Sequence, residues 1–224
     1  FVQTRAYLQA VEQLGRDRVL VLSGLPGVGK SAIADFLLYQ KVAEGYQPVI
    51  ARDGFEAAAK LHIEGVRQVF LYDDFLGATF LGEGGAALVR NEDRVITDFL
   101  NLIADDDDKL LILTTREHIL TEAVDRSERL RHASISDYRY VVRVGGYTAE
   151  QRARILYNHA YFNGLAPEYL ARLRRDDFFF KIIEHPKFSP RVVEWLTSAR
   201  RVTVPAADYQ VFAMRLLDDP ASLG

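Results

Sequence analysis

The chain has 224 residues, of which 49% are hydrophobic and 26% charged, so it is neither disordered nor collagen-like and can bury a large core. Its 28 Lys and Arg and 31 Asp and Glu give a net charge of −3, which excludes a global positive field for nucleic acid or an anionic membrane. It has no cysteine and no apolar run long enough to cross a bilayer, and we expect a cytoplasmic protein without membrane contact.

Five short apolar segments alternate with longer segments of helical period in the first two thirds of the chain. These segments are residues 18–23, 48–52, 68–73, 110–115 and 139–144. Strands that are apolar on both faces are typical of a parallel sheet covered by helices on each side. The sequence therefore predicts an α/β core with a five-stranded parallel sheet over residues 1–145, in which a glycine-rich segment, 77–90, forms a mobile loop near the site.

The last third of the chain shows helical patterns without a convincing strand. We expect helices over residues 148–161, 167–173, 176–184, 190–200 and 206–217. Several of these begin at a residue that suits a helix start, such as Thr148 as N-cap. The sequence therefore predicts a separate helical subdomain over residues 146–224.

The first predicted strand runs directly into a complete G-x-x-x-x-G-K-S motif, followed by a helix. In such a loop the backbone N–H groups surround a phosphate, and the helix N-terminus adds positive potential. We expect Lys30 to bridge the β- and γ-phosphates and Ser31 to bind Mg²⁺. An ordinary glycine turn is the weaker alternative, and the predicted nucleotide-binding residues are Gly24, Pro26, Gly27, Val28, Gly29, Lys30, Ser31 and Ala32.

Two acidic residues follow the third predicted strand. Hydrolysis of a nucleotide at a P-loop requires a carboxylate for the metal and a group that orients water. We expect Asp73 to hold Mg²⁺ through its water shell and Asp74 to polarise the attacking water. The alternative interpretation is a strand that ends in a capped turn.

An arginine ends the fourth predicted strand. Ligands of parallel sheets bind beyond the carboxyl ends of the strands, so Thr115 and Arg116 fall beside the γ-phosphate if this strand lies between the first and third. The charge of Arg116 would then stabilise or report on the phosphate, and the alternative is a surface arginine. Lys30, Asp74 and Arg116 are the predicted catalytic residues.

These motifs together resemble the STAND class of signal-transduction ATPases. The P-loop, the double acid at Asp73–Asp74 and the strand ending in Thr114-Thr115-Arg116 carry the resemblance. With its opening Phe1-Val2-Gln3-Thr4 and the stretch over residues 185–191, the whole chain resembles the bacterial novel STAND NTPase modules. The resemblance implies an AAA+-like P-loop NTPase fold with strand order 5-1-4-3-2 and a helical lid.

The same resemblance implies a switch that alternates between ADP and ATP. Such a module lies between an N-terminal effector, often a nuclease, and a C-terminal ligand-sensing array, so we expect this chain to be a piece of a longer protein. The implied partners are ATP with Mg²⁺, further copies of the chain in an activated homo-oligomer, and a phage protein as trigger in antiviral defence.

The resemblance also places a proline and an arginine of the lid against the nucleotide, and by position these are Pro190 and Arg191. Ser31 departs from the commoner threonine, and Phe188-Ser189-Pro190 departs from a Gly-x-Pro pattern. Judged from the residues alone, Ser189–Pro190 is equally well explained as a helix start. Arg191 would then place a cation at a helix N-terminus, which the helix dipole disfavours and an anionic partner would compensate.

Two other functions remain open at this point. One is an AAA+ ATPase that loads or remodels DNA, and the other is a P-loop kinase of small molecules. A GTPase is disfavoured because the chain has no Asn-Lys-x-Asp. We interpret the acidic run 105–108 as a solvated connector and the basic clusters at 172–175 and 200–201 as a solvated face, with a nucleic-acid or partner surface as the alternative.

Overall fold

The computed structural model describes residues 1–52, 54–77, 85–132 and 140–220, and these form two compact units. The core unit comprises Arg5–Gly145, and the helical unit begins at Gly146 and includes Phe1–Thr4. The start of the chain thus differs from the predicted core of residues 1–145, because Val2 packs against the apolar core of the helical unit.

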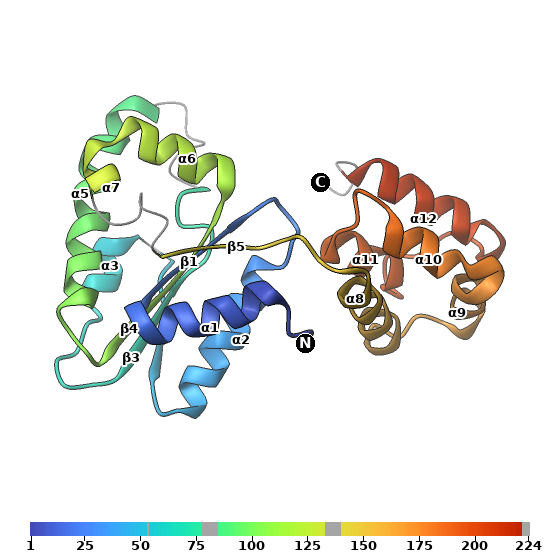
Figure 1. Ribbon diagram of the computed structural model, residues 1–224, viewed down its shortest axis with the longest axis horizontal. Coiled ribbons are helices and arrows are strands. Elements are labelled where there is room, and N and C mark those ends of the chain that lie inside the picture. The colour runs from blue at the N-terminus through green and yellow to red at the C-terminus, as the bar shows by residue number, and fades with distance from the viewer. Residues whose placement is uncertain (53, 78–84, 133–139, 221–224) are drawn as a thin grey trace. The chain divides into compact units, whose positions relative to one another are not determined.

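The core unit contains one five-stranded sheet in which every strand pairing is parallel. The strand order is β2-β3-β4-β1-β5 (Figure 1), so the predicted parallel sheet and its strand order are confirmed. The strands are β1 (Val19–Gly24), β2 (Gln47–Ile50), β3 (Gln68–Tyr72), β4 (Lys109–Arg116) and β5 (Val141–Arg143).

Helices cover both faces of the sheet (Figure 1) because the strands alternate between two apolar cores. Along β4, Leu110 and Ile112 face one core, and Leu111 and Leu113 face the other. The first core contains α1 (Arg5–Asp17) and α2 (Lys30–Ala43). The second contains α3 (Phe55–Ala59), α5 (Gly85–Ala104), α6 (Glu117–Arg126) and α7 (Glu128–His132).

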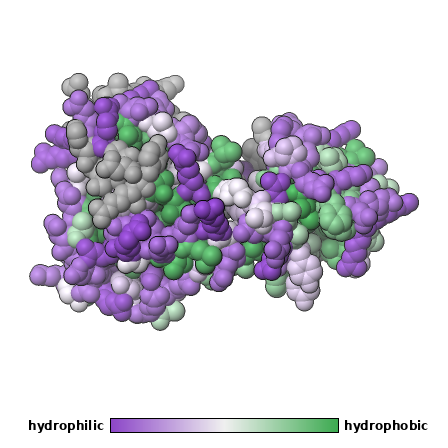
Figure 2. Space-filling view, in the orientation of Figure 1, coloured by the Kyte–Doolittle hydropathy of each residue, from purple (hydrophilic) through white to green (hydrophobic). Residues whose placement is uncertain are grey.

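The glycine-rich segment 77–90 differs from its prediction where it is described. Residues 78–84 lie outside the described residues, but α5 begins at Gly85, so the predicted loop is wrong for residues 85–90. Beyond this segment α5 has an apolar face that includes Phe99 and Ile103, both buried in the second core. Hydrophilic residues occupy much of the visible surface of the core unit (Figure 2).

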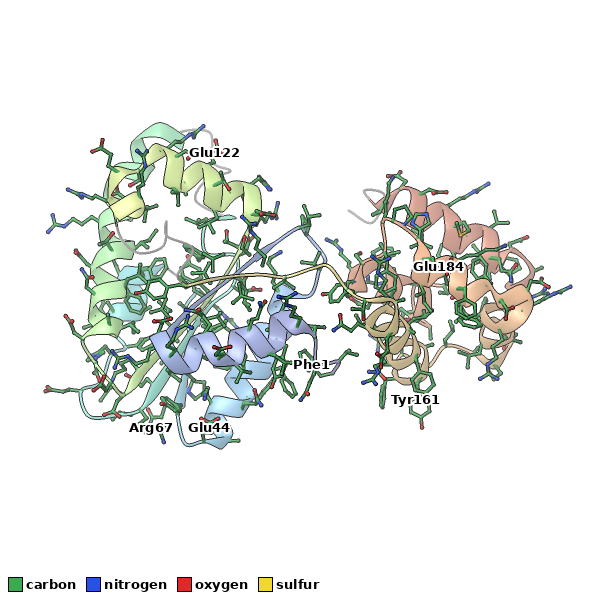
Figure 3. The ribbon with its side chains drawn as sticks, viewed as in Figure 1. Phe1, Glu44, Arg67, Glu122, Tyr161 and Glu184 are labelled. Carbon is green, nitrogen blue, oxygen red and sulfur yellow. The ribbon has the colours of Figure 1, made fainter. Side chains whose placement is uncertain are left out.

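Arg67 stabilises one turn of the core unit through two contacts. The turn between α2 and β2 is closed by Arg67, whose Nη1 donates to the Glu44 carbonyl oxygen at 2.9 Å (Figure 3). The Arg67 guanidinium also lies 4.0 Å from the centre of the Tyr46 ring, a cation–π contact.

The helical unit has a core of its own. Its helices are α8 (Ala149–Phe162), α9 (Pro167–Arg174), α10 (Phe178–Glu184), α11 (Pro190–Thr197) and α12 (Tyr209–Asp218), with 3₁₀ turns at Arg175–Asp177 and Ala206–Asp208. Thr148 forms a capping box with Gln151 at the start of α8, as its sequence position predicts. Tyr209 is fully buried at the centre of this unit, and its hydroxyl donates to the Leu196 carbonyl oxygen at 2.8 Å.

None of the helices in the described part of the chain has both the length and the apolar character needed to cross a membrane.

The acidic run before β4 is more than a solvated connector. Lys109 is fully buried, and its ammonium lies 2.9 Å from Asp106 Oδ2 and 2.8 Å from the Val66 carbonyl oxygen. His62 Nε2 also contacts Asp106 Oδ2 at 3.0 Å. The expectation is therefore wrong for Asp106, because a buried ammonium requires a carboxylate partner.

These contacts favour the ionised form of Asp106. The hydrogen bond from Lys109 lowers the pKa of Asp106 to about 2, against the effect of burial, and the Asp108 N–H and His62 contribute to the lowering. A carboxyl group with a lowered pKa stabilises the fold above its ordinary pKa and loses this contribution as the pH falls toward its folded pKa.

We expect Asp106→Asn to lower the free energy of unfolding by about 1–3 kcal/mol at pH 7, because it leaves a buried ammonium without its carboxylate. The difference from wild type should shrink as the pH falls from 4 toward 2, where wild-type Asp106 takes up its proton. Urea unfolding at several pH values measures both effects. The exposed neighbour Asp105 provides the control variant Asp105→Asn, and equal stability of the two variants would contradict the assignment.

Candidate functional site

The loop between β1 and α2 is shaped by glycines that other residues could not replace without strain. Gly27 and Gly29 have φ angles of 76° and 85°, in the left-handed region that favours glycine. A Cβ at Gly24 would lie 2.5 Å from the Val144 carbonyl oxygen. No side chain caps the start of α2, so its first N–H groups point into the loop without a side-chain acceptor.

Lys30 lies over this loop. Its Nζ donates to the carbonyl oxygens of Gly24 at 3.1 Å and Leu25 at 2.9 Å. Burial lowers the pKa of Lys30, and Arg116 adds to this effect, whereas the charges of Asp74 and Asp73 raise the pKa. The ammonium is therefore held at the mouth of the loop by backbone oxygens.

Asp73 directly follows β3, and its carboxylate accepts hydrogen bonds from two side-chain hydroxyl groups. Ser31 Oγ, from α2, lies 2.9 Å from Asp73 Oδ1 and 3.1 Å from Oδ2. Thr114 Oγ1, from β4, also donates to Asp73 Oδ1. Partial burial and the Asp73 charge raise the pKa of Asp35, one helical turn beyond Ser31.

The pair formed by Ser31 and Asp73 fits Mg²⁺. Hydroxyl and carboxylate oxygens are the ligands this ion prefers, and Mg²⁺ usually keeps several of its waters. The hydrogen bond of 2.9 Å between Ser31 Oγ and Asp73 Oδ1 shows that the hydroxyl and the carboxylate face each other. The two residues predicted to hold the metal are thus brought together, although 42 positions separate them in the sequence.

Asp74 has an unusual backbone conformation, with φ at 50°. Its carbonyl oxygen accepts from the Gly77 N–H at 2.8 Å, and a Cβ at Gly77 would collide with the Asp74 carboxylate. Arg116 Nη2 lies 3.6 Å from Asp74 Oδ2, and both side chains are partly exposed. Because Gly77 has no Cβ, the Asp74 carboxylate has room to lie beside Arg116.

The register of the sheet explains why these groups meet. Gly24 of β1 pairs with Arg116 of β4, and Tyr72 of β3 pairs with Leu113 of β4. Since all strands are parallel, their carboxyl ends lie at one edge. Two cationic and two anionic side chains therefore gather there: Lys30, Arg116, Asp73 and Asp74.

Two residues of this site were missed by sequence reasoning. Thr114 contacts both acidic residues, and Gly77 accommodates the Asp74 carboxylate. The position of Thr114 in β4 could have indicated its role. It lies two residues beyond Ile112 and four beyond Leu110, so it shares their face of the sheet, which is the face covered by α2. No sequence signal distinguishes Gly77 from a turn glycine.

Pro190 and Arg191 form the first turn of α11 and belong to the helical unit. Ser189 caps this helix, with its Oγ accepting from the Val192 N–H at 3.3 Å. Pro190 is half-buried and Arg191 is exposed. The helix start expected from the residues alone is thus present, and contact of either residue with a nucleotide stays a prediction.

Comparison with known families gives this site a context. The family model described as Novel STAND NTPase 3 matches residues 1–162, which is most of the chain. The chain belongs to this family. The resemblance inferred from the motifs is therefore confirmed, and the match ends at the last residue of α8. A search of curated proteins finds no significant match for this STAND NTPase.

Solved structures of AAA+ ATPases share the fold of this STAND NTPase. With PCH-2 of C. elegans the identity is 15% and the TM-score 0.56, over 97% of this chain and 66% of that chain. With a mutant form of Thermotoga maritima RuvB the identity is 15% and the TM-score 0.55, over 97% of this chain and 71% of that chain. With the replication initiator DnaA bound to AMPPCP and single-stranded DNA the identity is 16% and the TM-score 0.63, over 100% of this chain and 72% of that chain. The STAND NTPase thus spans about two thirds of PCH-2, and these similarities confirm its P-loop AAA+-like fold.

Proposed function

We propose that this chain is the ATP-binding and ATP-hydrolysing module of a STAND-type molecular switch. The observation that carries the proposal is the convergence of five side chains at one edge of the sheet. Lys30 lies over the glycine loop, Ser31 contacts Asp73, and Arg116 lies beside Asp74. Membership in a STAND NTPase family supports the same function.

The phosphate chain of ATP would bind to the loop between β1 and α2. The uncapped N–H groups at the start of α2 would donate to phosphate oxygens, and the Lys30 ammonium would exchange its two carbonyl partners for the terminal phosphates. Ser31 and Asp73 would hold Mg²⁺, Asp73 through water. When bound, Mg²⁺ neutralises charge on the terminal phosphates.

Asp74 would orient and polarise the water that attacks the γ-phosphate. A carboxylate that accepts a proton in the transition state must lie near the nucleophile, and Asp74 is the second acid at the same edge. Arg116 lies 3.6 Å from this carboxylate and is partly exposed, so it can contact a γ-phosphate from there. ADP lacks that group, and the Arg116 contact therefore distinguishes the two nucleotides.

The wider setting follows from the family resemblance. In the longer protein, a C-terminal region would sense a ligand, such as a phage protein, and an N-terminal effector would be activated. ATP would favour assembly of several copies in the cytoplasm, and ADP would favour a closed monomer. Pro190 and Arg191 of the helical lid would contact the bound nucleotide and make the lid sensitive to its state.

We expect Lys30→Ala to abolish ATP binding while the protein stays folded, because it removes the cation from the phosphate loop. Isothermal titration calorimetry measures this loss directly. Lys41→Ala provides a matched control, since Lys41 lies on the same helix and contacts only Glu44, at 2.8 Å, among the ion pairs of the described residues. Wild-type affinity in the Lys30→Ala protein would exclude the phosphate-loop assignment.

The two acidic residues should differ in their roles. We expect Asp74→Asn to retain Mg²⁺-ATP binding and to lower the hydrolysis rate by about 100-fold or more, the contribution of a general base. Asp73→Asn should instead weaken the Mg²⁺-dependent part of binding by about 10-fold or more. ATP titrations with Mg²⁺ and with EDTA, together with phosphate release, separate the two effects. Equal loss of binding in both variants would show that the roles are misassigned.

The switch itself is tested on the full-length protein by size-exclusion chromatography with ADP, and with ATP plus a candidate phage protein. We expect assembly only in the second condition, and Arg116→Ala should weaken assembly while ADP affinity stays nearly unchanged. Arg126→Ala, in an exposed ion pair with Glu122, is the control. An unchanged oligomeric state with steady phosphorylation of a metabolite would favour the kinase, and DNA-stimulated hydrolysis would favour the DNA-acting AAA+ ATPase.

A further inference from the structure

Thr114 contacts three successive residues beyond the end of β3. Its hydroxyl oxygen accepts from the Asp74 N–H at 2.8 Å, and the same hydroxyl donates to Asp73 Oδ1. Its carbonyl oxygen accepts from the Phe75 N–H at 3.0 Å. With 1% of its surface exposed, Thr114 makes these contacts in the interior of the core unit.

The position of Thr114 explains why a side chain, rather than the backbone of β4, accepts the hydrogen bond of the Asp74 N–H. The regular pairing of β3 with β4 ends at Tyr72 and Leu113, so the chain beyond Tyr72 has no ladder partner. A buried backbone N–H without an acceptor costs about 1–3 kcal/mol. A hydroxyl can accept one hydrogen bond and donate another, so Thr114 satisfies the Asp74 N–H and binds the Asp73 carboxylate together.

The backbone of Asp74 needs such support. Its φ angle of 50° lies in the left-handed region, which costs a non-glycine residue of order 1–3 kcal/mol unless the surroundings impose it. Thr114 holds the Asp74 peptide on one side, and the Gly77 N–H holds its carbonyl oxygen at 2.8 Å on the other. This conformation directs Asp73 to Ser31 and Asp74 to Arg116.

We propose that Thr114 is a positioning residue for the two acids. Its hydroxyl sets the direction of the Asp73 carboxylate and the orientation of the Asp74 peptide plane. The inference rests on the proposed function, because the roles of the acids come from it. By donating to Asp73 Oδ1, the hydroxyl fixes the carboxylate toward Ser31, where Mg²⁺ fits. By accepting from the Asp74 N–H, it keeps the second carboxylate next to Arg116.

The next residue provides an unusually close control. Thr115 is also fully buried, but its hydroxyl has no hydrogen-bond partner within the part of the chain that the structure describes. Alternation along β4 turns Thr115 toward the core formed with α5 and α6, away from Ser31 and Asp73. The expectation that Thr115 lies beside the γ-phosphate is therefore wrong. Two adjacent threonines of equal burial therefore differ in whether the hydroxyl contacts the acids.

The experiment compares Thr114→Val and Thr115→Val, each of which replaces a hydroxyl by a methyl group of similar size. We expect Thr114→Val to lower kcat, and to raise the Mg²⁺ concentration needed for half-maximal rate, by about 10–100-fold, as for other residues that orient metal ligands. ATP affinity measured in EDTA should stay close to wild type, because the phosphate loop is intact. Thr115→Val should match wild type in all three quantities.

A second pair of variants separates the effect of the hydroxyl on the rate from an effect on folding. Thr114→Ser and Thr114→Ala both lose the methyl group and differ only in the hydroxyl, so Ser should restore most of the rate that Ala loses. Thermal unfolding of each variant shows whether a rate change merely follows stability. If Thr114→Ala keeps the kcat and Mg²⁺ dependence of Thr114→Ser, the positioning role is overturned.

Failure of the proposed function would be visible separately in the wild-type protein. If wild type shows neither hydrolysis nor Mg²⁺-dependent ATP binding, the proposed function is wrong and the inference fails with it. If wild type hydrolyses ATP and Thr114→Val does so at the same rate and Mg²⁺ dependence, only the inference about Thr114 is wrong.

Discussion

The hydrogen bonds that meet at the Asp73 carboxylate join three elements that are far apart in the sequence. Ser31 comes from the start of α2, Asp73 from the end of β3 and Thr114 from β4. These contacts are possible because β4 lies between β1 and β3, which brings the glycine loop and the acidic pair to either side of one strand. Every group of the candidate site takes its position from this arrangement.

Polar residues hold β4 at both of its ends. At the amino end, buried Lys109 pairs with Asp106 and bonds to the Val66 carbonyl oxygen. At the carboxyl end, Thr114 binds Asp73 and Asp74. Between them the strand is apolar and fully covered, so its register depends on packing along its length and on specific hydrogen bonds at each end. A fixed register matters here, since a shift by one residue would exchange Thr114 with Thr115.

The helical unit carries its candidate nucleotide residues on a similarly ordered segment. Arg152 donates to the carbonyl oxygen of Ile183, in the last turn of α10, at 3.0 Å and to that of the C-cap residue His185 at 3.1 Å. Its guanidinium also lies 5.3 Å from the centre of the Phe188 ring. The stretch that leads to Pro190 and Arg191 is therefore held by hydrogen bonds and packing. By contrast, Tyr161 of the same unit projects from α8 with 68% of its surface exposed (Figure 3).

The sequence by itself determined the five strands, the helical character of the last third of the chain and the glycine loop that precedes Lys30. Local patterns suffice for these: apolar runs for the strands, Thr148 as a helix cap, and the spacing of Gly24, Gly29 and Lys30. The tertiary structure decided which distant residues meet. That Thr114 rather than Thr115 contacts the acids follows from strand register, and that Gly77 admits the Asp74 carboxylate follows from a left-handed turn. Asp106 differs from its acidic neighbours only because the fold buries Lys109 beside it. Such contacts depend on long-range packing, which no local pattern of residues records.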